Sequence, residues 1–286
     1  MAILADFKAE KPTWCPGCGD FGVLNALQRA SVELGLDPEE MVVVSGIGCS
    51  GKLSAYFGSY GLHSIHGRSL PTAQGVKLAN RELTVLAAGG DGDGFGIGLG
   101  HFIHAMRRNI DITYLVMDNH IYGLTTGQTS PTSDAGMITK TAPTGAVEEP
   151  VHPLHLALVT GCGFVAQGFS GDIVQLATIV KRAIAHKGFS FVNIFSPCVT
   201  YNKQNTYEFY KSHVKKVEDD PTYDAGNRFA ALERVTEANA LLTGVLYEGD
   251  RVTFEDGHAK YSTKGLATQE HTLSDDDYVK LLADFR

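Results

Sequence analysis

Five cysteines offer the clearest chemistry in the sequence, and four of them lie in loop-forming contexts. Cys15 and Cys18 form Cys-Pro-Gly-Cys, Cys49 lies in Gly-Ile-Gly-Cys-Ser-Gly, and Cys198 follows Ser-Pro. A chain in a reducing compartment seldom keeps disulfides, so this pattern indicates a metal site, an iron–sulfur cluster or a redox pair. The four residues suit a cluster, whose thiolates converge from short loops containing Gly and Pro. Structural zinc and scattered free thiols remain open, and Cys162, between apolar residues, is expected in the core.

An acidic and an amide residue are expected at the ends of neighbouring strands. Asp91 lies in Gly-Asp-Gly after one apolar run, Asn119 follows the next run, and 26 residues separate Gly92 from Asn119. With the backbone carbonyl of Ile121 they would offer Mg²⁺ the oxygen ligands it prefers, and Mg²⁺ can hold a diphosphate. The spacing is similar to a thiamine diphosphate motif, although His120 stands where that motif has a second asparagine. The alternative is an Asp and an Asn that only cap turns.

Two glycine-rich segments look like nucleotide-binding loops, but the spacing of their residues does not match the known motifs. In GGDGDGFGIGLG the glycines from Gly90 to Gly100 fall only on even positions, so G-x-G-x-x-G never occurs. In GIGCSGKL, Leu53 stands where a phosphate-binding loop needs Ser or Thr to bind Mg²⁺. Hydride transfer on a dinucleotide and NTP hydrolysis are therefore disfavoured.

The elements that position these residues alternate between short apolar strands and helices. We expect strands at 42–45, 83–88, 112–117 and 190–195, and helices at 21–34, 71–80, 96–108, 152–160 and 172–186, with Asp172 capping the last. This alternation predicts an α/β fold with a doubly wound, mostly parallel sheet. Such sheets bind ligands at the carboxyl ends of their strands, where both glycine-rich segments begin.

Two segments stand outside the alternation. Residues 125–150 are rich in Thr, Gly and Pro, and so long a loop in an α/β domain is usually functional or partner-bound. Beyond about residue 200 we expect an extension with a helix near 227–242, a hairpin near 245–262 and a short terminal helix. We therefore divide the chain into a cofactor-binding domain, 1–215, and a C-terminal extension, 216–286, that contacts another subunit.

Composition excludes several classes of function. The 286 residues carry 24 Lys plus Arg against 32 Asp plus Glu, a net charge of −8, which argues against nonspecific nucleic-acid binding. No apolar run is long enough to span a bilayer, and no signal peptide is visible. We expect a cytoplasmic chain with neither nucleic acid nor membrane as partner.

Taken together, the motifs resemble one known family. The segments CPGCGDFG, SGIGCSGK, HGRSLPTAQGVKLAN, GGDGDGFGIGLGHF, DNHIYGLTTGQTSPT and SPC resemble the β subunit of 2-oxoacid:ferredoxin oxidoreductases, over about residues 12 to 215. The resemblance implies a sheet of the thiamine-diphosphate-binding type that holds thiamine diphosphate, Mg²⁺ and one [4Fe–4S] cluster. It implies cluster ligands Cys15, Cys18, Cys49 and Cys198, magnesium ligands Asp91, Asn119 and Ile121, and cofactor contacts Ile47, Gly48, Cys49, Ser50, His66, Gly92, Asp93, Gly123 and Leu124.

The resemblance also implies the reaction and its partners. Thiamine diphosphate accepts the electrons of decarboxylation of a 2-oxoacid, the cluster passes them to ferredoxin, and coenzyme A takes the acyl group. His66 would be catalytic, through a hydrogen bond to the reacting adduct or a phosphate; otherwise it is a loop histidine. A thiamine enzyme also needs a glutamate from a second domain, and this chain has length and motifs for the diphosphate half only. We therefore expect an α subunit to complete a hetero-oligomer.

Two other classes use only part of this residue set. A non-oxidative thiamine decarboxylase or synthase would leave the four cysteines idle, and an iron–sulfur electron-transfer scaffold would leave Asp91 and Asn119 idle. Lys52 and Arg68 are candidate cations for a substrate carboxylate or the diphosphate, and Thr126 stands where some relatives carry lysine. The overall resemblance favours 2-oxoglutarate over pyruvate.

Overall fold

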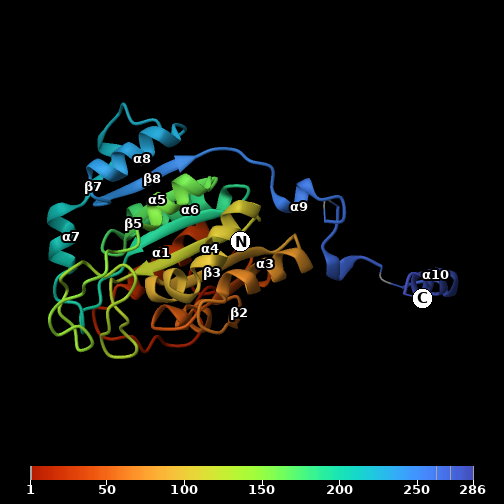
Figure 1. Cartoon of the computed structure of the whole chain (residues 1–286), viewed down its shortest axis with the longest axis horizontal. Coiled ribbons are helices and arrows are strands. Elements are labelled where there is room, and N and C mark those ends of the chain that lie inside the picture. Colours follow the sequence, from red (N-terminus) through yellow and green to blue (C-terminus); the bar gives the residue numbers. More distant parts are fainter. Residues whose placement is uncertain (1, 262, 271, 286) are drawn as a thin grey trace.

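A single sheet of eight strands runs through the part of the chain that the structure describes (Figure 1). The structure is a computed structural model and describes residues 2–261, 263–270 and 272–285. The strand order is β2-β1-β3-β4-β6-β5-β8-β7, and the first six strands in that order are parallel. The bounds are β1 Met41–Ser45, β2 Tyr60–His63, β3 Thr84–Gly90, β4 Thr113–Asp118, β5 Phe164–Phe169, β6 Ser190–Phe195, β7 Lys215–Lys216 and β8 Leu242–Glu248. The expected doubly wound, mostly parallel sheet and its four expected strands are confirmed.

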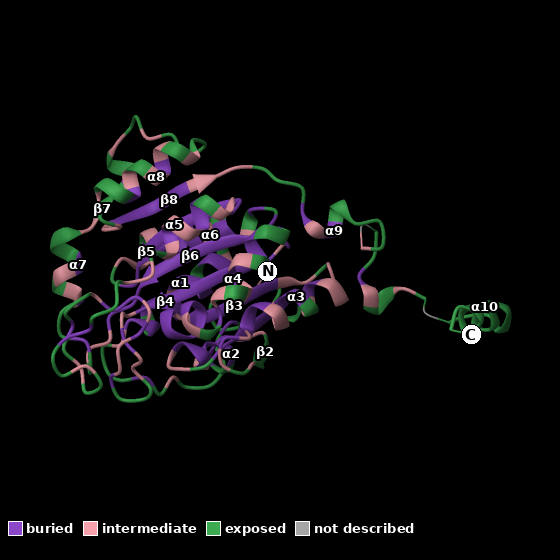
Figure 2. Ribbon diagram, in the orientation of Figure 1, coloured by how far each residue is buried: buried purple, intermediate pink, exposed green. Residues whose placement is uncertain are grey.

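Helices cover both faces of the sheet, because successive strand side chains point to opposite sides. Met41 and Val43 of β1 pack in the core beneath α1 and α6, while Val42 and Val44 pack in the core beneath α3, α4, α5 and α8. The inner strands are accordingly buried between the two helical layers, whereas the edge strands β2 and β7 are exposed (Figure 2). The helices are α1 Asp20–Glu33, α2 Leu53–Tyr56, α3 Ser69–Ala79, α4 Leu99–Arg108, α5 Pro153–Thr160, α6 Ile173–Ala185, α7 Tyr207–His213, α8 Arg228–Glu237, α9 Phe254–Gly257 and α10 Asp275–Ala283. None of the described helices is both long and apolar enough to cross a membrane.

The side-chain cap expected for one helix is confirmed. The carboxylate of Asp172 accepts a hydrogen bond from the backbone N–H of Gln175 at 3.1 Å, as expected for the start of α6. The helix expected at 96–108 begins only at Leu99, because the glycine-rich turn Asp93–Ile97 precedes it and Gly96 has non-helical dihedral angles. This turn leaves the residues after β3 free to face the carboxyl edge of the sheet.

The C-terminal segment adds to the sheet rather than forming a hairpin. After α8, Asn239 and Ala240 adopt left-handed backbone conformations, with φ of 48° and 58°, and the chain reverses into β8. β8 pairs antiparallel with β5 and parallel with β7. The hairpin expected near 245–262 is therefore wrong: β5 offers β8 an open edge, and Thr253 caps the short helix α9 where a second arm would lie. The expected terminal helix is α10, which has no buried residue and lies apart from the sheet (Figure 1).

The strand order reverses at β1. β2 lies on one side of β1 and β3 on the other, so the connections leaving β1 and β3 diverge above the sheet. In open parallel sheets such a point leaves a crevice at the carboxyl ends of the strands. Both glycine-rich segments of the sequence follow these strands, which places them at the crevice.

Asn109 offers a test of how the layers are joined. It ends α4 with a φ of 55°, its Oδ1 accepts from Phe189 N at 3.1 Å, and its Nδ2 donates to Arg251 O and Val252 O. Asn109→Gly removes these bonds from a fully buried position and should lower the free energy of unfolding by about 1–3 kcal/mol. Asn109→Ala also forces alanine into the left-handed region and should cost about 1 kcal/mol more. Urea unfolding of both variants measures the difference, and equal stability would contradict the role of the left-handed cap.

Candidate active site at the carboxyl edge of the sheet

A cavity of about 580 Å³ opens at the crevice, lined by the loops after β1, β3 and β4 and by His66. The sequence analysis named twelve residues as cofactor contacts or magnesium ligands, and the structure brings all twelve to this cavity. They are Ile47, Gly48, Cys49, Ser50, His66, Asp91, Gly92, Asp93, Asn119, Ile121, Gly123 and Leu124. Their shared location fits one ligand; the role of each residue stays a prediction.

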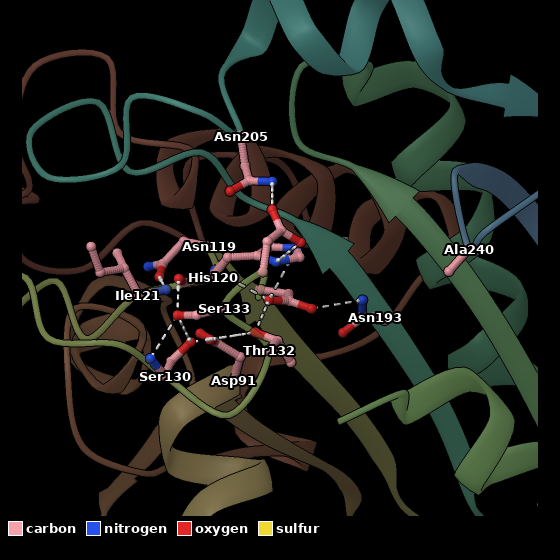
Figure 3. A network of polar contacts seen from close by, with 12 residues as sticks. Asp91, Asn119, His120, Ile121, Ser130, Thr132, Ser133, Asn193, Asn205 and Ala240 are labelled. Carbon is pink, nitrogen blue, oxygen red and sulfur yellow. Dashed lines mark hydrogen bonds and ion pairs between the residues drawn. The ribbon is translucent and has the colours of Figure 1, made fainter. Parts of the chain in front are cut away.

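Buried negative charge marks the corner of the cavity where magnesium is expected. Asp91 and Asp118 are 1% and 2% exposed, at the ends of the neighbouring strands β3 and β4. The single hydroxyl of Thr132 lies 2.7 Å from Asp91 Oδ2 and 2.9 Å from Asp118 Oδ1 (Figure 3). Burial, and then the charge of Asp118, raise the pKa of the Asp91 carboxyl. A divalent cation would relieve this crowding of carboxylates, so the residues present fit Mg²⁺.

Local hydrogen bonds shape the loop after β4. Asn119 Oδ1 accepts from Ile121 N at 3.0 Å, and Asn202 Nδ2 donates to the Asn119 carbonyl at 2.9 Å. These contacts bring the Asn119 side chain and the Ile121 backbone together in one turn beside Asp91 (Figure 3). One lone pair of the Asn119 amide oxygen remains for a cation.

His120, the departure from the usual motif, lies between two carboxylates. Its Nε2 is 3.8 Å from Asp118 Oδ1 and its Nδ1 is 4.0 Å from Asp134 Oδ1. Burial lowers the pKa of His120, but Asp118, Asp91 and Asp134 outweigh burial and raise it. Its φ of 57° is a conformation that Asn and His tolerate better than most residues. Histidine therefore permits the same backbone conformation in the turn, and when protonated it places a positive charge beside Asp118.

Asp93 ties the loops of the cavity together. Its Oδ1 accepts from Ile47 N at 2.9 Å and from Gly67 N at 2.8 Å, and lies 3.0 Å from His66 Nδ1. A Cβ atom at Gly46 would lie only 1.9 Å from Asp93 Oδ2, so the first glycine loop must pass this carboxylate without a side chain. His66 Nδ1 therefore lies beside the Asp93 carboxylate, at a distance of 3.0 Å but without hydrogen-bond geometry.

The four loop cysteines gather beside the same cavity. A Cβ atom at Gly123 would lie 3.4 Å from Cys198 Sγ and 4.0 Å from Cys49 Sγ. Burial, then the charge of Asp20, and then the neighbouring cysteines raise the pKa of Cys18. The same causes, with burial the largest, raise the pKa of Cys49 to about 11. Thiols in such surroundings become thiolates only when a cationic centre binds them.

The thiols can be compared with the two kinds of metal centre left open by the sequence. Within the described residues, no group of three or more His, Cys, Asp or Glu side chains is placed to hold one metal ion. A [4Fe–4S] core puts irons and sulfides between its ligands, so it needs thiolates farther apart than a tetrahedral zinc ion does.

Several other residues have clear places. Cys162 is fully buried and its Sγ donates to Phe164 O at 3.2 Å, which confirms it as a core cysteine. Lys52 Nζ donates to Thr13 Oγ1 at 3.2 Å, and the Arg68 guanidinium contacts His101 Nε2. Neither cation is among the residues that line the cavity.

Sequence reasoning missed four residues that shape the site. Asp118 immediately precedes Asn119, and its place at a strand end is a signal that could have been used. Tyr122, whose hydroxyl donates to the Gly92 carbonyl at 3.0 Å, follows the predicted ligand Ile121. Thr132 lies in the long loop, and Trp14 donates to the Cys49 carbonyl at 2.7 Å from the N-terminal segment. Nothing in their local sequence indicates these long-range contacts.

Comparison with known proteins assigns the chain to a family. Residues 46–194 match the thiamine pyrophosphate enzyme C-terminal TPP binding domain, and residues 198–263 match the C-terminal region of the pyruvate ferredoxin oxidoreductase beta subunit. The 2-oxoacid:ferredoxin oxidoreductase subunit beta of Saccharolobus solfataricus is 48% identical over 223 residues, 77% of this chain and 73% of that protein. The 2-oxoglutarate synthase subunit KorB of Methanocaldococcus jannaschii is 41% identical over 188 residues, 66% and 70% of the two chains.

A solved structure agrees over nearly the whole length. A chain of the 2-oxoglutarate:ferredoxin oxidoreductase from Magnetococcus marinus, solved with 2-oxoglutarate, coenzyme A and succinyl-CoA bound, aligns with a TM-score of 0.91. The two are 41% identical, and the alignment covers 99% of this chain and 96% of that one. Two family models and a relative 48% identical to this chain lead to the same assignment. This chain belongs to the family of 2-oxoacid:ferredoxin oxidoreductase β subunits.

Proposed function

We propose that this β subunit holds thiamine diphosphate through Mg²⁺ and one [4Fe–4S] cluster, and that with an α subunit it converts a 2-oxoacid to acyl-CoA. The overall reaction consumes the 2-oxoacid and coenzyme A and yields acyl-CoA, CO₂, one proton and two electrons, which pass to ferredoxin. The observation that carries the proposal is one cavity lined both by the predicted magnesium ligands and by Cys49. Neither a non-oxidative thiamine enzyme nor a simple electron-transfer scaffold uses both sets.

The position of each residue around the cavity indicates its proposed role. Asp91, the Asn119 amide oxygen and the Ile121 carbonyl would hold Mg²⁺, and the Gly48 to Ser50 backbone would approach the diphosphate. His66, whose Nδ1 lies 3.0 Å from Asp93 Oδ1, would donate or accept a hydrogen bond at Nε2. Bound thiamine diphosphate would supply the electron sink for decarboxylation. Cys49 would then link the diphosphate loop to the cluster, so electrons need no mobile carrier between the two cofactors.

2-Oxoglutarate is the proposed substrate. The supporting observations are the relatives named 2-oxoglutarate synthase and the solved neighbour with 2-oxoglutarate and coenzyme A bound. Rates with 2-oxoglutarate, pyruvate and branched-chain 2-oxoacids test this choice. The cytoplasmic location expected from the sequence stays a prediction.

The α subunit would supply the catalytic glutamate. We propose that it covers the open cavity and the 125–150 loop, and that the 216–286 extension contributes to the interface between the subunits. The exposed apolar side chains of Val279, Leu282 and Phe285, on or beside α10, support a role of this terminal segment in an interface.

Cysteine variants test the cluster. Alanine at Cys15, Cys18, Cys49 or Cys198 should lower the iron content and the visible absorption of anaerobically purified protein, because each change removes a thiolate ligand. Cys162→Ala is the matched control and should keep its iron, since this thiol is packed in the core. Iron analysis and absorption spectra measure both, and bleaching by Cys162→Ala alone would overturn the ligand assignment.

Asp91→Ala and Asn119→Ala test the magnesium site. Removal of a group that hydrogen-bonds a metal ligand typically lowers the affinity for the metal 10- to 100-fold. Removal of a direct ligand should therefore weaken Mg²⁺-dependent thiamine diphosphate binding by at least about tenfold. The iron content should not change, because neither residue is a thiolate. Calorimetric titration of the cofactor at saturating Mg²⁺ gives the affinities; if both variants match the unmodified protein, the assignment fails.

Dependence on the α subunit is the third test. A missing catalytic acid removes assistance worth about a hundred- to ten-thousand-fold in rate, so the isolated chain should not reduce ferredoxin with a 2-oxoacid. Activity should return when the α subunit is added. Robust turnover by the isolated chain, checked by mass spectrometry for other subunits, would place the acid within this sequence.

A further inference from the structure

We infer that Thr132 is a positioning residue for the magnesium corner, and that through it cofactor binding is coupled to the order of the 125–150 loop. The inference rests on the proposed magnesium site. It concerns a residue from a segment that has no helix or strand between residues 125 and 150 apart from one bridge residue, Gln128. The coupling would make this loop part of the cofactor site.

The contacts of Thr132 place it between two carboxylates. Its side chain is 2% exposed, and its hydroxyl lies within hydrogen-bond distance of Asp91 Oδ2 and Asp118 Oδ1 (Figure 3). The hydroxyl carries one hydrogen, so it can donate fully to only one of them at a time.

Thr132 is itself held from both sides in a turn at residues 130–133. Ser130 N donates to Ser133 Oγ at 2.8 Å, and Ser133 Oγ donates to the His120 carbonyl at 2.7 Å. Val151 N donates to the Pro131 carbonyl at 2.8 Å, which ties the far end of the loop to the same turn. The turn is therefore bonded to the residue between the two predicted ligands Asn119 and Ile121.

Two buried side-chain amides on neighbouring strands of the sheet hold Asp118 in place. Asn193 Nδ2 of β6 lies 3.2 Å from Asp118 Oδ2 and 2.9 Å from Gln167 Oε1 of β5. Gln167 Nε2 donates to the Ala240 carbonyl at 2.6 Å, in the segment that leads into β8. Asp118 is thus held by a side chain of the sheet, and the Thr132 hydroxyl connects it to Asp91.

The consequence is reciprocal coupling between metal and loop. A cation on Asp91 favours the conformation of Asp91 that Thr132 contacts, and that contact requires the 130–133 turn to be docked. By linkage, whatever docks the turn raises the affinity for the cation by the same factor. The loop should therefore be more protected from hydrogen exchange with Mg²⁺ and thiamine diphosphate bound than without them.

Three variants of the α–β complex test this coupling. Thr132→Val keeps the shape but lacks the hydroxyl, Thr132→Ser keeps the hydroxyl, and Thr178→Val is a control at an exposed position of α6, outside the loop. Thr132→Val should weaken Mg²⁺-dependent thiamine diphosphate binding about 10- to 100-fold, the usual effect of losing a group behind a metal ligand. It should also abolish the cofactor-induced protection of residues 125–150, with iron content unchanged, while the other two variants behave like the unmodified complex.

The outcomes separate this inference from the proposed function. If Thr132→Val binds the cofactor with unchanged affinity and loop protection, the positioning role is overturned while the magnesium site stands. If the unmodified complex binds no thiamine diphosphate in the presence of Mg²⁺, the proposed function itself fails, and this inference with it. Hydrogen exchange of the unmodified complex tests the coupling without any variant, so the test stands even if Thr132→Val does not fold. If the cofactor does not increase the protection of residues 125–150 in the unmodified complex, the coupling is overturned.

Discussion

Buried carboxylates at the carboxyl edge of the sheet are the constraint on which the rest of the site depends. Asp91, Asp93 and Asp118 are each 2% exposed or less, and all three follow or end β3 and β4. Buried charge is costly unless hydrogen bonds or opposite charge compensate it. Backbone N–H groups donate to Asp93, and the Asn193 amide and the His120 N–H donate to Asp118. Asp91 accepts from the Thr132 hydroxyl and lines the cavity, so its charge lies where a cation is proposed.

The same constraint explains the glycines and the loops. Gly46 must pass the Asp93 carboxylate without a side chain, and Gly92 leaves room for the Tyr122 ring, which a Cβ atom would approach to 2.2 Å. The loops can then close over the strand ends and bring Cys49 beside Gly123 and Cys198. One edge of the sheet therefore serves both the proposed diphosphate site and the proposed cluster, which is what transfer of electrons between them requires.

Much of this arrangement could be predicted because it depends on contiguous residues. Asp91 and Asn119 directly follow apolar runs that form parallel strands, so they meet at one edge of the sheet whatever the details of packing. The Asp172 cap was predictable for the same reason, since its bond spans three residues. β8 was harder, because Leu242–Glu248 becomes a strand through the open edge of β5, more than seventy residues earlier in the chain.

The sequence alone determined the α/β class, the residues whose side-chain types suit a metal or a cofactor, and the strand ends at which those residues gather. These follow from side-chain type and local periodicity. Only the tertiary structure decided that Asp93 accepts from the backbone of Ile47 and Gly67 and that Thr132 contacts both Asp91 and Asp118. It also decided that Lys52 and Arg68 lie outside the cavity lining. Each of these depends on distances between segments separated by tens of residues, and such distances are set by the packing of helices and loops on the sheet.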